Sequence, residues 1–118
     1  MFKRAFVRPP SASFAQGLTS ADLGKPDLDK ALEQHARYCA ALEHCGLELT
    51  RLSPDAAHPD STFVEDTAIL TTRGAILTRP GAASRAGEVA SIAAALPQFF
   101  SRNSFCLNQP LSQQLWRH

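Results

Sequence analysis

Hydrophobic and polar residues alternate over a short run at the start of the chain and then lose any regular period. Residues Phe2 to Arg8 alternate for part of their length and end at a pair of prolines. This pattern predicts a short strand, because alternate side chains of a strand share one face. From Ser11 to Lys25 the chain is rich in Ser, Ala and Gly, so a loop is expected there.

A helical pattern follows this loop. Asp27 can accept hydrogen bonds from the free N–H groups of a first turn, and Asp29 adds a negative charge at the same end. Gly46 supplies the left-handed residue that commonly ends a helix. A short leucine-rich strand is predicted next, over residues 47–52. The expected apolar stripe of the helix consists of Leu28, Leu32, Cys39 and Leu42, with Ala31 and His35 beside it.

The second half of the chain predicts two strands and another helix. The strands cover Phe63 to Thr71 and Ala75 to Thr78, and the turn Arg73-Gly74 joins them as a hairpin. The helix runs from about Ser84 to Leu96 and stops at Pro97. Its expected buried face consists of Val89, Ile92, Ala93 and Leu96. Because helices alternate with strands along the chain, the fold class is α/β or α+β, and α/β is favoured.

Composition and charge narrow the class of protein. The chain has 118 residues, of which 44% are apolar and 19% charged, and its formal net charge is +1. This balance gives no electrostatic reason to expect nucleic acid or a membrane surface as a partner. The three cysteines, Cys39, Cys45 and Cys106, follow no disulfide framework, so a reducing cytoplasmic compartment is expected. His35 and Cys39 have the spacing of metal ligands, but two ligands do not make a site, and no metal is expected.

Carboxylates gather in one short segment. Pro59 to Thr67 contains Asp60, Glu65 and Asp66, and carboxylates match the planar donors of a guanidinium. An acidic, solvated turn is the commoner interpretation of such a segment when only its residues are considered. Arg85, near the start of the second predicted helix, is a candidate for binding an anion, and a surface arginine is the alternative.

Several segments, taken in order, resemble the dimethylarginine dimethylaminohydrolases. The resemblance is nearly continuous from Phe2 to about Leu96, which is far more specific than a single short motif. It implies the pentein fold, an α/β propeller of five ββαβ-like modules, of which this chain is expected to supply about the first two. The matching segments are Gly17–Ser20, Leu23–Asp27, Ala31–His35, Pro59–Asp66 and Thr78–Glu88.

The resemblance also implies a reaction and a set of binding residues. In the family, a cysteine thiolate attacks the guanidinium carbon of an N-methylated arginine, an alkylamine leaves, and water releases citrulline, without a cofactor. By position, Asp66 resembles the carboxylate that grips the substrate guanidinium, with Glu65 beside it. Asp60 and the carbonyl of Leu18 resemble the groups that bind the α-amine. Arg85 resembles one of two arginines that bind the α-carboxylate.

The chain departs from the family at its end. No residue matches the nucleophilic cysteine or the catalytic histidine, so the chain is expected to be inactive by itself. Two modules of a five-module propeller leave a side face and strand edges uncovered, so the chain is also expected to self-associate. Residues 1–100 are interpreted as the N-terminal part of the hydrolase domain, and residues 101–118 as a divergent tail that a frameshift would explain. Cys106 is a weak candidate nucleophile, because only Ser104 to Leu107 resembles the nucleophile segment. A non-catalytic remnant that binds arginine-like ligands and a fragment of an arginine deiminase are the alternatives.

Overall fold

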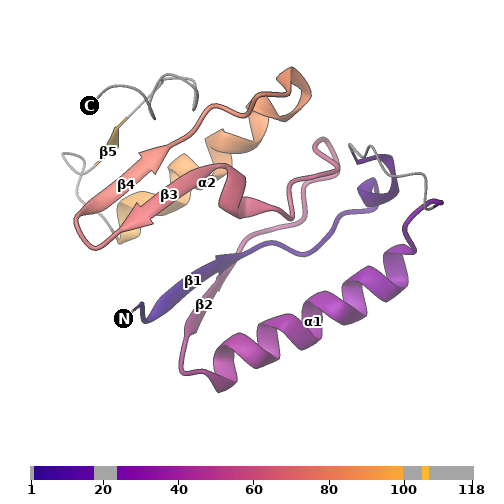
Figure 1. Cartoon of the computed structure of the whole chain (residues 1–118), viewed down its shortest axis with the longest axis horizontal. Coiled ribbons are helices and arrows are strands. Elements are labelled where there is room, and N and C mark those ends of the chain that lie inside the picture. Colours follow the sequence, from indigo (N-terminus) through magenta and orange to yellow (C-terminus); the bar gives the residue numbers. More distant parts are fainter. Residues whose placement is uncertain (1, 18–23, 100–104, 107–118) are drawn as a thin grey trace. The chain divides into compact units, whose positions relative to one another are not determined.

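The chain folds into two compact units in the computed structural model (Figure 1). The structure describes residues 2–17 and 24–99, and the backbone of residues 105–106. One unit extends to Thr62, and the other begins at Phe63. Over these described ranges, none of the helices combines the length and the apolar character that crossing a bilayer requires. The predicted boundary near residue 100 lies outside the described residues and stays a prediction.

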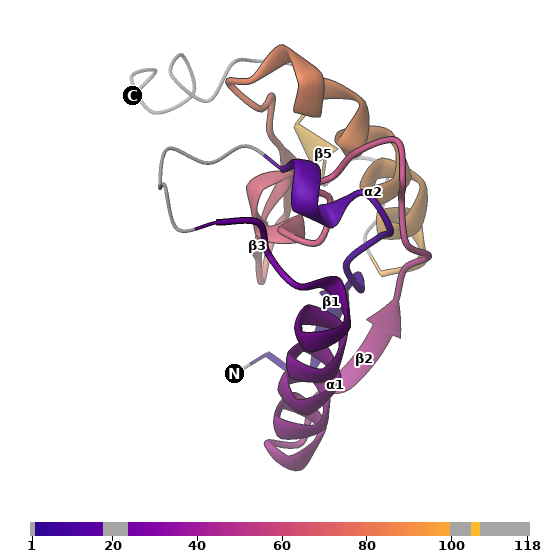
Figure 2. The same ribbon diagram turned by 90° about the vertical axis from the view of Figure 1, so that its right-hand side faces the viewer.

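The first unit is a βαβ arrangement. Strand β1 (Arg4–Val7) pairs in parallel with β2 (Glu48–Arg51), and Arg4 lies opposite Glu48. Helix α1 (Leu28–His44) connects the two strands and runs alongside them in two perpendicular views (Figures 1 and 2). Both strands were predicted, and the parallel pairing follows from the helix that separates them, since parallel neighbours need a crossover connection.

Both predicted ends of α1 are confirmed. The Asp27 carboxylate accepts a hydrogen bond from the Lys30 N–H at 3.2 Å, and Gly46 has a φ of 90°. The predicted stripe was wrong at Leu32, which is exposed. The inward face is centred on His35 and Cys39, and this leaves Leu32 at its margin, towards solvent. The half-buried or buried positions of that face are Leu28, Ala31, His35, Cys39 and Leu42.

The second unit has the order ββαβ. Strands β3 (Ala68–Thr71) and β4 (Gly74–Leu77) form an antiparallel hairpin, and β5 (Phe105–Cys106) pairs in parallel with the other edge of β4. Helix α2 (Val89–Ala95) lies between β4 and β5 in the chain. The unit therefore matches the ββαβ-like module that the resemblance implied, within the predicted α/β class.

Three predicted boundaries in this unit were wrong. Residues Val64–Asp66 form a 3₁₀ turn (η2), so the first predicted strand begins only at Ala68. The hairpin turn consists of Thr72 and Arg73, because Gly74 already pairs with Thr71. The predicted second helix is α-helical only in α2. The flanking turns are 3₁₀ helices, η3 (Ala83–Glu88) and η4 (Leu96–Gln98).

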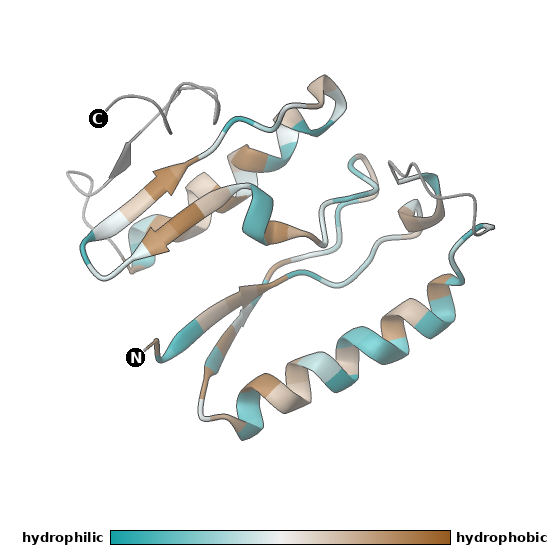
Figure 3. Ribbon diagram, in the orientation of Figure 1, coloured by the Kyte–Doolittle hydropathy of each residue, from teal (hydrophilic) through white to brown (hydrophobic). Residues whose placement is uncertain are grey.

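Each unit buries a small apolar core. Val7 and Cys39 are buried in the first unit, and β4 and α2 supply the core of the second (Figure 3). The buried apolar residues of β4 and α2, with the residue after α2, are Ala75, Leu77, Ile92, Ala95 and Leu96. Of the predicted face of α2, Val89 and Ala93 are only half-buried. Two charged residues, Arg8 and Glu88, are also buried. Glu88 contacts Arg85, one of the predicted binding residues.

Candidate functional site

The turn η2 holds two of the predicted binding residues. Its backbone is closed by the Thr67 side chain, whose hydroxyl donates to the Val64 carbonyl at 2.6 Å. The Thr78 hydroxyl donates to the carbonyl of Asp66, and the Thr78 N–H donates to the carbonyl of Thr67 at 3.0 Å. Thr78, which follows β4, thus fixes the main chain of the turn at Asp66 and Thr67. The side chains of Glu65 and Asp66 are left exposed.

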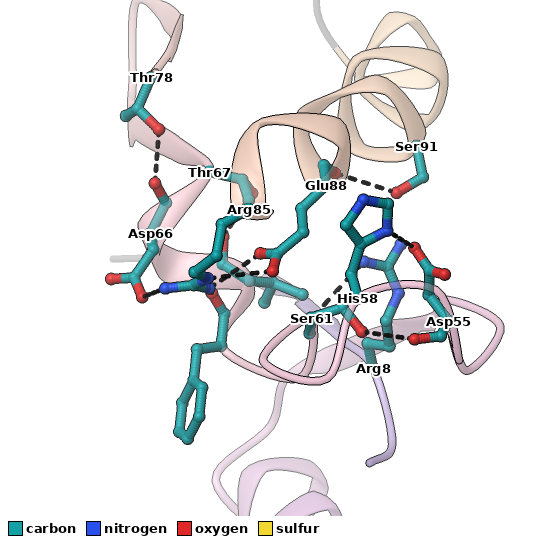
Figure 4. A network of polar contacts seen from close by, with 12 residues as sticks. Arg8, Asp55, His58, Ser61, Asp66, Thr67, Thr78, Arg85, Glu88 and Ser91 are labelled. Atoms are coloured by element: carbon teal, nitrogen blue, oxygen red, sulfur yellow. Dashed lines mark hydrogen bonds and ion pairs between the residues drawn. The ribbon is translucent and has the colours of Figure 1, made fainter. Parts of the chain in front are cut away.

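Asp66 pairs with a guanidinium of its own unit. Nη1 of Arg85, from η3, donates to Oδ2 of Asp66 at 2.7 Å (Figure 4). The side chain of Asp66 remains 51% exposed, whereas that of Arg85 is only 16% exposed. The structure therefore brings together two of the residues that the sequence singled out, the predicted guanidinium-binding carboxylate and the predicted carboxylate-binding arginine.

Glu88 is the second partner of Arg85. Nε of Arg85 donates to Oε1 of Glu88 at 3.0 Å, and Nη2 donates to Oε2 at 2.8 Å. The Glu88 side chain is 1% exposed. Two parallel hydrogen bonds from one guanidinium edge to one carboxylate form the bidentate pair that fixes the plane of an arginine. The 3₁₀ turn favours this contact, because residues three apart eclipse one another in it.

The two carboxylates determine the charge of the cluster. The bond to Glu88 is the largest cause that raises the pKa of Arg85 above its usual value; burial opposes it, and the bond to Asp66 adds to it. Arg85 is therefore a permanent cation between two carboxylate groups. With both carboxylates ionised, the cluster of Asp66, Arg85 and Glu88 has a formal charge of −1, which favours a cationic group beside it.

Asp60 lies in the first unit and is buried, with 8% exposure. A Cβ atom built on Gly17 would lie 2.3 Å from Oδ1 of Asp60 and 3.3 Å from the carbonyl oxygen of Phe14. Only glycine fits there without a shift of the neighbours. Leu18, the next residue, lies outside the described residues. The contact between Asp60 and Gly17 nevertheless joins the two chain segments that the resemblance assigned to one α-amine site.

Sequence reasoning did not single out Glu88, nor the polar contacts of Arg8 and Asp55 in the first unit. Arg8 is buried, and its Nε donates to the Ser53 carbonyl at 3.0 Å. Asp55 accepts from the His58 ring at 2.7 Å. The sequence spacing could have revealed the Arg85–Glu88 pair, because Glu88 follows Arg85 by three residues, the spacing at which opposite charges pair on a helix. The partners of Arg8 are main-chain carbonyls, which leave no mark in the side-chain pattern.

Three further residues were candidates for chemistry: Cys106, His35 and Cys39. The described part of Cys106 is its backbone, in β5. His35 Nε2 and Cys39 Sγ are 3.4 Å apart, and burial, followed by the charge of Arg51, lowers the pKa of His35. Within residues 2–17 and 24–99, no group of three or more His, Cys, Asp and Glu side chains is arranged to hold a metal ion.

The chain is similar to known proteins over most of its length. No protein-family model matches the chain. It is 51% identical over 100 residues to a dimethylarginine dimethylaminohydrolase of Pseudomonas aeruginosa, over 85% of the chain and 39% of the relative. A crystal structure from that organism, a mutant complexed with citrulline, superposes with a TM-score of 0.85 at 48% identity, over 89% of this chain and 41% of that one.

A more distant likeness concerns the fold only. The N-terminal domain of ArgZ, a cyanobacterial arginine dihydrolase, superposes with a TM-score of 0.72 at 18% identity, over 92% of this chain and 40% of that one. The chain spans about two fifths of the length of the curated relative, since it covers 39% of it. The chain is thus similar to part of the dimethylarginine dimethylaminohydrolases, and its fold is also similar to that of the arginine dihydrolase domain.

Proposed function

We propose that this chain carries the ligand-binding part of a dimethylargininase-type hydrolase, which converts N-methylated arginine to citrulline and an alkylamine. The observation that carries the proposal is that Asp66 already pairs with a guanidinium, that of Arg85, at 2.7 Å. A half-exposed carboxylate with this partner is suited to accept a second guanidinium, that of a substrate, in its place. The 51% identity over 100 residues supports a methylarginine substrate over free arginine.

The proposed roles follow the family positions. Asp66 binds the guanidinium, with Glu65 next to it on η2. Asp60 and the carbonyl of Leu18 bind the α-amine, and Arg85 binds the α-carboxylate. A zwitterionic ligand with a cationic tail offers one partner for each of these charges, and holding both ends places the guanidinium carbon for attack. The attack requires a cysteine thiolate and a histidine, for which this chain offers no matching residue, so we expect no citrulline release from it alone.

A titration of the purified chain with dimethylarginine tests the binding role. Asp66→Asn should weaken binding about tenfold or more, because it removes one charge-assisted contact. Glu48→Gln is the matched control, since Glu48 is an exposed carboxylate on β2. Equal affinities of the two variants would contradict the site. Citrulline release that disappears in Cys106→Ala would show instead that the chain is itself a catalyst.

A further inference from the structure

Arg85 is held by two carboxylates that differ in how a ligand can reach them. Glu88 is 1% exposed and makes two hydrogen bonds, at 3.0 and 2.8 Å, whereas Asp66 is 51% exposed and makes one, at 2.7 Å. A dissolved ligand can therefore compete for Asp66 and cannot reach Glu88. The two contacts also use different parts of the guanidinium. Glu88 takes the edge formed by Nε and Nη2, and Asp66 takes Nη1 (Figure 4).

This asymmetry matters because the proposed ligand requires the Asp66–Arg85 pair to separate. If a substrate guanidinium takes Asp66, Arg85 loses one anionic partner and can replace it with the substrate α-carboxylate. Without Glu88, Arg85 would keep only weaker contacts, such as that to the Phe63 carbonyl at 3.5 Å, when the ligand takes Asp66. The buried fork to Glu88 does not depend on the ligand and keeps the guanidinium plane fixed.

We infer that Glu88 is the positioning residue of the binding site: it holds Arg85 in place while the ligand exchanges the Asp66–Arg85 pair for two new pairs. The inference rests on the proposed function and goes beyond it, because it assigns a role to a buried carboxylate that need not touch the ligand. It also explains why an ionised arginine and an ionised glutamate are kept together away from solvent. A buried ion pair is seldom justified by stability alone, since desolvation offsets much of its attraction.

The test compares two ligands that differ only in the α-carboxylate, dimethylarginine and its decarboxylated analogue dimethylagmatine. Glu88→Gln keeps the shape of the side chain but removes the charge that fixes Arg85. It should weaken dimethylarginine binding about tenfold, the effect of one charge-assisted hydrogen bond, and dimethylagmatine binding less than about twofold. Glu33→Gln is the matched control, because Glu33 forms an exposed ion pair with Arg37 on α1, and it should change neither affinity.

A second measurement needs no variant of Glu88. The Nε–H proton of Arg85, which points at Glu88, should stay protected from solvent exchange when the wild-type chain is saturated with dimethylarginine. The resonance of this proton is assigned in NMR spectra as the one that disappears in the Arg85→Lys variant. Loss of protection on saturation would overturn the inference, as would equal weakening of both ligands by Glu88→Gln. If the wild-type chain binds neither ligand, the proposed function itself fails, and the inference fails with it.

Discussion

Each unit buries part of one arginine, and the partners of the two arginines differ in kind. In the first unit, Arg8 donates to the main-chain carbonyls of Ser53 and Ser61, at 3.0 and 3.5 Å. In the second unit, Arg85 donates mainly to two carboxylates, with a longer contact of 3.5 Å to the Phe63 carbonyl. A main-chain carbonyl belongs to the fold and cannot be exchanged for a ligand unless the backbone moves. A half-exposed carboxylate such as Asp66 can change its partner while the backbone stays in place.

The difference separates a structural arginine from one suited to binding. The Arg8 carbonyl also accepts a hydrogen bond from the Thr62 hydroxyl at 2.7 Å, so Arg8 connects the end of β1 to the segment 53–62 through both its side chain and its main chain. That segment contains Asp60. In the proposed site, Arg8 would act by fixing the backbone near Asp60, whereas Arg85 would act through its own charge.

The largest expected effect on stability is at Glu88. Glu88→Ala removes a fork of two hydrogen bonds from an arginine that is only 16% exposed. Breaking a buried pair costs about 3–5 kcal/mol, and the loss should lie near the lower end of that range because Arg85 keeps its bond to Asp66. Urea unfolding of the wild type and the variant measures the loss. The exposed pair Glu43–Arg51 supplies the control, since Glu43→Ala should cost at most about 1 kcal/mol. Similar losses of unfolding free energy in the two variants would mean that the buried Arg85–Glu88 pair stabilises the fold no more than an exposed pair does.

The next effect is at Arg8. Arg8→Met keeps an apolar stem of similar length but leaves the carbonyls of Ser53 and Ser61 without this donor. The Ser61 carbonyl belongs to a buried residue, and a buried polar group that loses its partner costs about 1–3 kcal/mol. The Ser53 contact is only partly buried and adds less, so a loss of about 2–3 kcal/mol is expected. Chemical denaturation checks the loss. If the comparison of the two arginines is correct, Arg8→Met should lower dimethylarginine affinity only through Asp60, so combining it with Asp60→Asn should add little to the loss of affinity.

These two arginines also show how far the sequence predicts the structure. Periodicity and capping residues correctly predicted β1, α1 with Asp27 and Gly46 at its ends, and the hairpin of β3 and β4. They failed where short-range side-chain contacts override the period. At Phe63 to Thr67, the Thr67 hydroxyl closes a 3₁₀ turn in place of a strand. The resemblance directed attention to Asp66 and Arg85, but Arg8 was missed because its partners are carbonyls that every residue possesses.

A smaller effect is expected at Gly17. An added Cβ would meet Oδ1 of Asp60 at 2.3 Å, and an overpacked contact of this kind costs about 1–3 kcal/mol. Gly17→Ala should therefore reduce the free energy of unfolding by that amount, and Asp60→Ala in the same chain should recover part of the loss, because it removes the atom that clashes. Thermal unfolding of the two single variants and the double variant measures the coupling. Strictly additive effects would show that the two residues do not meet.

The smallest effect concerns pH and the ion pair of Asp55 with His58, 2.7 Å apart. Burial acts to raise the pKa of Asp55, but the hydrogen bond and charge of His58, the Ala57 N–H and Arg8 outweigh it, so the pKa lies below its usual value. A carboxyl with a lowered pKa stabilises the fold above its unfolded pKa of about 3.9, and this contribution is lost as pH falls through the folded pKa.

Asp55→Asn should therefore reduce stability at pH 6 by at most about 1 kcal/mol, the usual range for a partly exposed pair, and the difference from wild type should shrink below pH 4. Unfolding free energies measured between pH 3 and pH 6, on the wild type and the variant, test this. Asp29→Asn is the control, since Asp29 is an exposed carboxylate in the first turn of α1 and lies outside the Asp55–His58 pair. A constant difference across this range would mean that Asp55 acts through its hydrogen bond to Ala57 and not through its charge.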